Sequence, residues 1–178
     1  MSMVKEFIYP TFILAIVCFI ISLALAVTFK VTDPIIQAAI KSDADFARTQ
    51  VFTGDSNFTQ INLTTSVENC TEIYKANNNS GYVFTTASKG FGGTMTVMVG
   101  MDADSKITGV KLMTHNETPG LGTKTSEPSF TDQFIGIEAE QIDPDVDSIS
   151  GATISSNAFK RAVQVAFLAF EEVKKGGQ

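Results

Sequence analysis

The stretch YVFTTASKGFGGTMTVMVGMDADSKITGVKLMT, residues 82–114, decides the fold of this chain. It holds three runs rich in β-branched and aromatic residues, Tyr82–Ala87, Thr94–Met101 and Ile107–Thr114, in which apolar and polar side chains partly alternate. Runs of this kind are typical of β-strands. The connections between them are short. Because parallel neighbours need a crossover of about a dozen residues or more, the three strands are predicted to pair antiparallel.

Weaker signals flank these strands on both sides. Residues 53–80 are polar and rich in asparagine, with shorter strand candidates at Gln60–Leu63 and Glu72–Tyr74. On the C-terminal side, Glu127–Phe134 favours a short helix and Ile154–Lys174 a long one. The predicted fold class is therefore α+β, an antiparallel sheet with helices packed against it.

The N-terminal stretch FIYPTFILAIVCFIISLALAVTF, residues 7–29, contains no charged side chain. At about 1.5 Å per residue it spans roughly 35 Å as a helix, enough to cross a bilayer core of about 30 Å. A cleaved signal peptide has a shorter apolar core and a small-residue cleavage site. We therefore expect a single retained transmembrane anchor.

A helix-start signal, Thr32-Asp33-Pro34, follows the anchor, and its proline suits the first turn of a helix. It predicts a separate stalk helix. The expected organisation is a short segment at residues 1–6, the anchor at 7–29, the stalk at 30–52 and one further domain at 53–178.

Composition excludes several classes of function. The net charge is −6 and no run of Lys and Arg exceeds two residues, so nucleic acid is not an expected partner. The cysteines are Cys18, inside the apolar stretch, and Cys70, and the one histidine is His115. Neither cysteine has a second ligand at metal-site spacing, which predicts no protein-held zinc or iron–sulfur site. If this domain does redox work, the redox group must be imported.

The segment HNETPGLGTK, residues 115–124, follows the end of the last predicted strand. A connecting turn would explain Pro119 and Gly120. It explains the side chains at 117 and 118 and the second glycine, Gly122, less well. Glycine is common where a ligand approaches the backbone closely, so a binding segment is the alternative.

The segment DSISGATISSNA, residues 147–158, places five hydroxyl side chains just before the apolar pattern of the long C-terminal helix, which begins at Phe159. One hydroxyl is enough to cap a helix, so a cap with spare serines is one interpretation. The other is a phosphate site, since a helix N-terminus offers unpaired N–H groups and the positive end of its dipole. In that case the Thr153 hydroxyl would lie close enough to the phosphate to be esterified.

Asp147–Thr153 resembles the D-x-x-[S/T]-G-A-T flavinylation motif of FMN-binding subunits in ion-pumping respiratory complexes. Gly90–Asp102, Ile107–Val110 and His115–Gly122 resemble the same family in the same order, although Ser105 stands where a glycine is common. The resemblance covers about residues 80–175 and the anchor.

Two relatives compete within this family. One is the G subunit of the Rnf complex, which couples ferredoxin oxidation to reduction of NAD or another acceptor. The other is the C subunit of the sodium-pumping NADH:quinone oxidoreductase, which usually has a longer insert after the anchor. The compact chain is more similar to the Rnf protein.

The resemblance implies a non-autonomous electron-relay subunit of an ion-translocating complex. Thr153 would carry FMN through a phosphoester bond, made by a dedicated flavin transferase. The resemblance also implies that the domain stands on the outer face of the cytoplasmic membrane. Charged residues around the anchor do not determine this orientation, because basic groups occur on both sides of it.

The hypothesised site has no catalytic or metal-binding residue, since the flavin would supply the chemistry. Backbone groups beside the attachment residue would hold the phosphate, and the 117–122 segment would line the flavin ring. The full set of expected cofactor residues is Thr153, Ser150, Gly151, Ala152, Ile154, Glu117, Thr118, Leu121, Gly122, Lys124 and Asp147.

Several of these roles have alternatives. Lys124 either reaches a phosphate or flavin oxygen or stays solvated. Asp147 either positions the motif for the transferase or caps a turn. His115 is expected to be a hydrogen-bonded residue at the strand end, and Phe91 to belong to the core. The rival functions are a membrane-anchored adaptor domain without a cofactor and an enzyme that binds FMN non-covalently.

Overall fold

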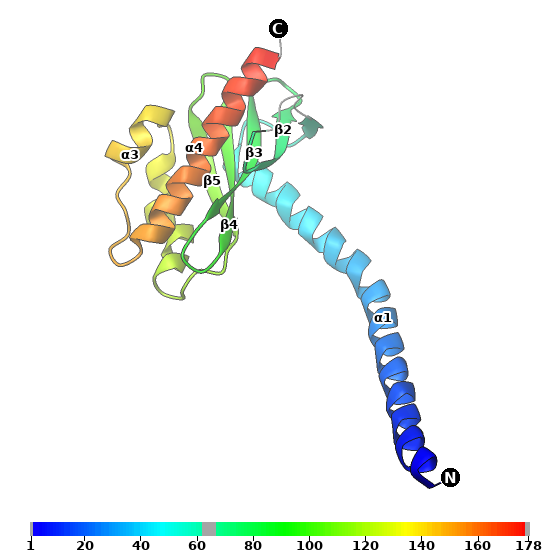
Figure 1. Cartoon of the computed structure of the whole chain (residues 1–178). Helices are drawn as coiled ribbons and strands as arrows, with labels where there is room; N and C mark the ends of the chain where they lie inside the picture. The colour runs from blue at the N-terminus through cyan, green and yellow to red at the C-terminus, as the bar shows by residue number, and fades with distance from the viewer. Residues whose placement is uncertain (1, 62–66, 177–178) are drawn as a thin grey trace. The chain divides into compact units, whose positions relative to one another are not determined.

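The computed structural model describes residues 2–61 and 67–176 (Figure 1). The chain divides into two compact units, residues 1–44 and residues 45–178. Helix α1 (Ser2–Val51) runs through the first unit and ends in the second. Within the described residues, α1 is the one helix long and apolar enough to cross a membrane.

The helix start expected at Thr32-Asp33-Pro34 is wrong, because α1 continues through it. A proline inside a helix removes one backbone hydrogen bond. Strong helix formers follow it in the run Gln37-Ala38-Ala39, and they favour continuation of the helix. Where the membrane-spanning part of α1 ends stays a prediction.

The second unit contains a five-stranded antiparallel sheet in the order β1-β2-β3-β4-β5. The strands are β1 (Phe58–Ile61), β2 (Cys70–Ala76), β3 (Gly81–Lys89), β4 (Thr94–Asp102) and β5 (Ile107–Thr114). The three strands of the deciding stretch are confirmed as antiparallel neighbours. The predicted strand Glu72–Tyr74 lies within β2. Of the predicted strand Gln60–Leu63, residues 60 and 61 belong to β1, and residues 62 and 63 lie outside the described residues.

Helix α4 (Thr153–Gly176) crosses one face of this sheet, as Figure 1 shows. Between β5 and α4 the chain forms short helical turns: η1 (Gly122–Ser126), α2 (Pro128–Thr131), η2 (Asp132–Phe134), η3 (Ala139–Gln141) and α3 (Ile142–Asp145). The short helix expected at Glu127–Phe134 is present as α2 and η2. These observations confirm the α+β fold class.

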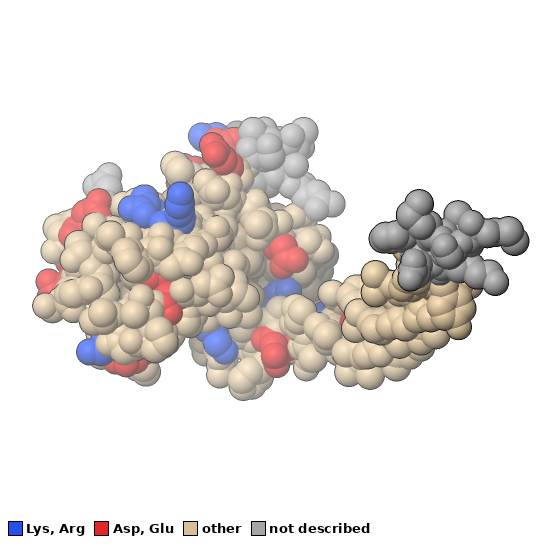
Figure 2. All heavy atoms as spheres, turned by 60° about the horizontal axis from the view of Figure 1, so that its bottom comes forward, with Lys and Arg blue, Asp and Glu red and all other residues tan. Residues whose placement is uncertain are grey.

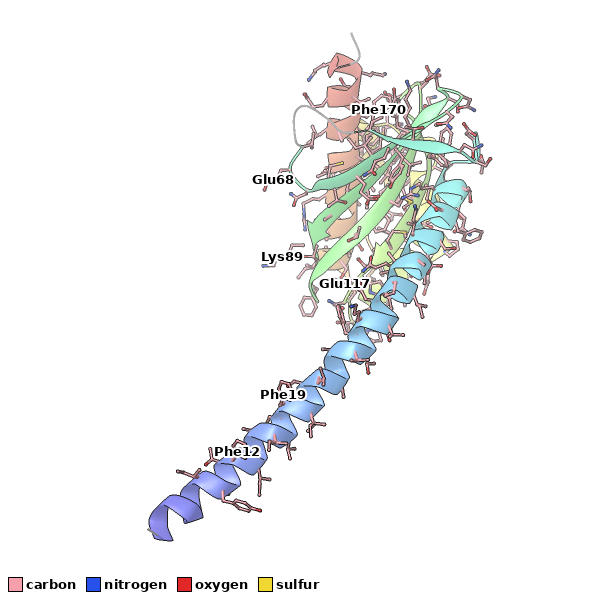
Figure 3. All side chains as sticks on the ribbon, turned by 90° about the vertical axis from the view of Figure 1, so that its right-hand side faces the viewer. Phe12, Phe19, Glu68, Lys89, Glu117 and Phe170 are labelled. Carbon is pink, nitrogen blue, oxygen red and sulfur yellow. The ribbon has the colours of Figure 1, made fainter. Side chains whose placement is uncertain are left out.

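The core lies between α4 and the sheet. Two aromatic groups build it: Phe170, labelled in Figure 3, meets Phe84 of β3, and Phe159 meets Phe130 and Phe134 of the short turns. Ring centroids in these pairs are 5.2–6.2 Å apart, the range of favourable edge and tilted contacts. Packing of the short turns onto the start of α4 holds the chain segment that precedes this helix.

The last turn of α1 covers the opposite face of the sheet. Ala47, Val51 and Phe52 are buried there. Glycines at 100 and 109 permit the contact, since a Cβ on Gly100 would lie 2.3 Å from the Val51 carbonyl oxygen. The Thr108 hydroxyl donates to the same oxygen at 2.6 Å. Residues 45–52 therefore belong to the sheet domain.

Candidate functional site

A cavity of about 310 Å³ opens at one end of the second unit. Three segments that are distant in the sequence form it: the β3–β4 connection, the segment after β5 and the start of α4. Its volume lies at the lower end of the range of small-molecule sites, about 300–1,000 Å³. The lining residues are Phe91, Thr118, Leu121, Gly122, Gly151, Ala152, Thr153, Ile154 and Ser155.

The start of α4 presents unpaired backbone donors to this cavity. Gly151 has a φ of +79°, a left-handed conformation that side chains rarely adopt, and it turns the chain into the helix. The first helical hydrogen bond runs from the Ser156 N–H to the Ala152 carbonyl at 2.9 Å. The N–H groups of the three residues between them precede that bond. They lie at the positive end of the helix dipole, an arrangement that suits an anion.

The hydroxyls around this helix start have separate positions. Ser156 Oγ accepts the Ile149 N–H and donates to the Ala152 carbonyl, both at 3.0 Å. Ser155 Oγ donates to the Glu117 carboxylate. Thr153 is exposed and lines the cavity. The two serines thus serve the fold, and Thr153 is the exposed one among these three hydroxyl residues.

The segment after β5 forms the facing wall. Its turn is closed by the Leu121 N–H, which donates to the Thr118 carbonyl at 3.2 Å, and Gly120 takes a φ of +75°. The Leu121 side chain is half-exposed, and its Cδ2 atom lies 3.5 Å from the position of a Cβ on Gly151. It offers apolar surface beside the helix start.

Seven of the residues expected to hold a cofactor therefore line one cavity, and four do not. Ser150, Lys124 and Asp147 are exposed outside the lining, and the Asp147 N–H donates to Gln133 Oε1 at 2.8 Å. Glu117 is buried behind the wall. The described residues contain no group of three or more metal-ligating side chains.

Three further residues at or near the site bear on the sequence predictions: Phe91, Ser155 and His115. The expectation that Phe91 belongs to the core is wrong, since its side chain is 68% exposed at the cavity. The glycine-flanked loop that carries it lies beyond the end of β3 and the start of β4. The sequence offered one signal for Phe91 as a site residue: a large apolar side chain among three glycines. The prediction from sequence also missed Ser155 as a lining residue. His115 is hydrogen-bonded at the strand end, because its Nδ1 accepts the Glu117 N–H at 3.3 Å.

Charge on the domain is mixed. On the face shown in Figure 2, acidic and basic side chains are interspersed and form no extended basic area.

Comparison with known proteins relates the chain to membrane redox complexes. Residues 90–167 match the family model of the FMN-binding domain. The chain is 30% identical over 162 residues to the G subunit of the proton-translocating ferredoxin:NAD(+) oxidoreductase complex of Clostridium ljungdahlii, covering 86% of this chain and 85% of that protein. It is 31% identical over 123 residues to the G subunit of the Na(+)-translocating ferredoxin:NAD(+) oxidoreductase complex of Acetobacterium woodii, covering 61% and 59%.

A solved structure is also similar. The C subunit of the Na(+)-translocating NADH-quinone reductase of Parabacteroides distasonis superimposes with a TM-score of 0.45 at 25% identity, covering 55% of this chain and 58% of that one.

Proposed function

This chain belongs to the family of G subunits of Rnf-type ion-translocating oxidoreductase complexes and contains an FMN-binding domain, and from this membership we propose that it relays electrons through FMN attached to Thr153. The observation that carries the proposal is the exposed Thr153 hydroxyl at the N-terminus of α4, inside the cavity. Bound FMN takes up and releases electrons one at a time, and the protein supplies position and electrostatics.

The residues divide into two roles in this proposal. Thr153 forms the phosphoester, and the backbone around Gly151, Ala152 and Ile154 holds the phosphate at the helix N-terminus. Thr118, Leu121 and Gly122 line the flavin ring, with Leu121 as apolar packing. Phe91, from the β3–β4 connection, adds an aromatic surface of the kind that packs on planar rings.

Three further parts of the proposal concern the surroundings of the domain. A flavin transferase attaches the FMN, and Asp147 helps to present the loop to it. Other subunits of a membrane redox complex exchange electrons with it, as the names of the relatives suggest. The domain stands on the extracytoplasmic side of the membrane, anchored by α1. The family resemblance supports these parts.

Thr153→Ala tests the attachment. In cells that contain a flavin transferase, the wild-type chain should gain the mass of one FMN minus water, and its denatured band should fluoresce. Thr153→Ala should show neither signal, because no hydroxyl remains at the lining position.

Ser148→Ala is the matched control, since it removes an exposed hydroxyl from the same loop, outside the cavity lining and at a position that the motif leaves open. It should keep the adduct. A wild-type chain without added mass would contradict the proposal. Flavin released on denaturation would indicate non-covalent binding. If Thr153→Ala only lowered stability by about 0.5–2 kcal/mol and no flavin were found in either chain, a simple helix cap would be the better interpretation.

A further inference from the structure

Glu117 is a buried carboxylate with an unusual set of partners. Its side chain is 5% exposed. Oε1 accepts the Gly92 N–H at 3.2 Å, and Oε2 accepts the Ser155 hydroxyl at 2.5 Å. None of the ion pairs in the described part of the chain includes it. Buried carboxylates are normally paired with a cation, so an unpaired one at this position indicates a specific role.

The carboxylate joins the three segments that form the cavity. It comes from the segment after β5, it accepts from the β3–β4 connection, and it accepts from the first turn of α4. Glycines enclose it on both sides: a Cβ on Gly90 would lie 2.2 Å from Oε1, and one on Gly122 would lie 2.6 Å from Oε2. Figure 3 shows Glu117 at the same end of the sheet as Lys89, the last residue of β3.

One hydrogen bond connects the Glu117 carboxylate to the lining of the cavity. Ser155 lines the cavity, and the hydroxyl of this residue donates to the carboxylate behind it. The N-terminal dipole of α4 and the two hydrogen bonds stabilise the negative charge in place of a cation. A charge in such a low-dielectric position acts strongly on a group in the cavity.

We propose that Glu117 is a positioning residue, whose carboxylate locks the Gly90–Gly93 loop and the start of α4 together and whose charge lowers the midpoint potential of FMN in the cavity. The second part rests on the proposed function. Reduction adds negative charge to the flavin, and a fixed negative charge behind the wall opposes that addition.

Two variants separate geometry from charge. Glu117→Gln keeps the shape, since the amide oxygen can accept from Gly92 while the amide nitrogen donates to Ser155. It removes the charge and keeps both contacts, with the direction of the Ser155 hydrogen bond reversed. Glu117→Ala leaves both donors without a partner and leaves a void. Glu127→Gln is the matched control, because it removes an exposed carboxylate that lies outside the cavity lining.

The charge is tested on the flavin-loaded full-length chain in detergent by spectroelectrochemical titration. Glu117→Gln should have a more positive midpoint potential than the wild-type chain, and Glu127→Gln should match the wild type. An unchanged potential in Glu117→Gln would overturn the role of the charge.

The geometry is tested without flavin, in the Thr153→Ala chain, by hydrogen exchange at the Gly92 amide. Exchange should stay slow with Glu117→Gln and become several-fold faster with Glu117→Ala, because the acceptor is lost. Equal exchange in Glu117→Ala and its parent would overturn the locking role. If Glu117→Ala does not fold, Glu117→Asp replaces it: this carboxylate is one methylene shorter and cannot reach both donors, so unchanged exchange at Gly92 would overturn the locking role. A wild-type chain that carries no flavin would refute the proposed function and leave this measurement valid.

Discussion

At the scale of single residues, the hydroxyls at the start of α4 show how one local pattern serves two purposes. Ser155 and Ser156 turn inward and hydrogen-bond to the fold, whereas Thr153, two residues earlier, lines the cavity. At 3.6 residues per turn, residues two positions apart lie on nearly opposite sides of a helix, which places Thr153 away from Ser155. The spacing within the helix thus separates the hydroxyl proposed for attachment from the one that donates to Glu117.

Ser105 is a second residue whose backbone conformation affects the stability of the domain. Its φ is +71°, in the left-handed region that favours glycine. In the left-handed region, a residue with a side chain lowers the stability of the fold by about 1–2 kcal/mol. A glycine lowers it by about 0.4–1 kcal/mol, because it raises the conformational entropy of the unfolded chain. Ser105→Gly should therefore stabilise the domain, by about 0.5–1 kcal/mol in urea denaturation.

The hydrogen bond from Lys174 Nζ to Ser105 Oγ, 3.2 Å long and exposed, is the one contact this change removes among the described residues. Lys174→Ala in the chain that keeps Ser105 measures how much this hydrogen bond contributes to the free energy of unfolding. A glycine variant less stable than the parent would show that this contact outweighs the strain.

Asp55 makes the stability of the domain depend on pH in the acid range. The N–H groups of Asn57 and Asn78, and also that of Ser56, donate to its carboxylate and hold the pKa of Asp55 below its usual value of 3.8. A lowered pKa in the folded state contributes stability above the usual value, and this contribution is lost as the pH falls through the lowered one.

Asp55→Ala should consequently lower the melting temperature at pH 6, and the gap to the wild type should narrow below a pH of about 4. Melting curves from about pH 2 to 7 measure the gap. Asp104→Ala, at an exposed carboxylate in another turn, is the control and should show no such trend. A gap that stays constant with pH would contradict the role of the charged carboxylate.

At the scale of elements, the contact between α1 and the sheet depends on glycine. The last turn of α1 lies so close to β4 that a Cβ on Gly100 would meet the Val51 carbonyl oxygen at 2.3 Å. Gly100→Ala should force the helix end away from the sheet and cost about 1–3 kcal/mol, the usual range for overpacking. Urea denaturation of the full-length chain measures this cost.

Gly176→Ala provides the control, because a Cβ there meets nothing within 4 Å. It should leave the urea midpoint unchanged. Equal midpoints for Gly100→Ala and the wild type would mean that the helix end is loosely attached.

At the scale of the whole molecule, the sheet domain needs the end of α1. The sequence predicted a domain from residue 53, but Ala47, Val51 and Phe52 are buried in the unit that begins at residue 45. A fragment of residues 45–178 should be more stable than one of residues 53–178. Loss of the valine and phenylalanine burial alone is worth about 3–6 kcal/mol.

Chemical denaturation of the two fragments side by side measures the difference. A fragment of residues 41–178 should match the one from 45, since Lys41 and Asp43 are exposed. If the fragment from 53 were as stable as the others, residues 45–52 would not belong to the folded domain.

The sequence by itself determined the apolar helix at the N-terminus, the three central strands with their antiparallel pairing, the long last helix and the two motifs that meet at the cavity. Each of these follows from neighbours along the chain: hydrophobic period, turn length or glycine spacing. Only the tertiary structure decided that α1 continues through Pro34 to cap the sheet, that Phe91 is exposed and that Glu117 is buried behind the wall. These outcomes depend on contacts such as Gly100 with Val51 and Glu117 with Ser155. The partners in such contacts lie tens of residues apart, where local propensity carries no information.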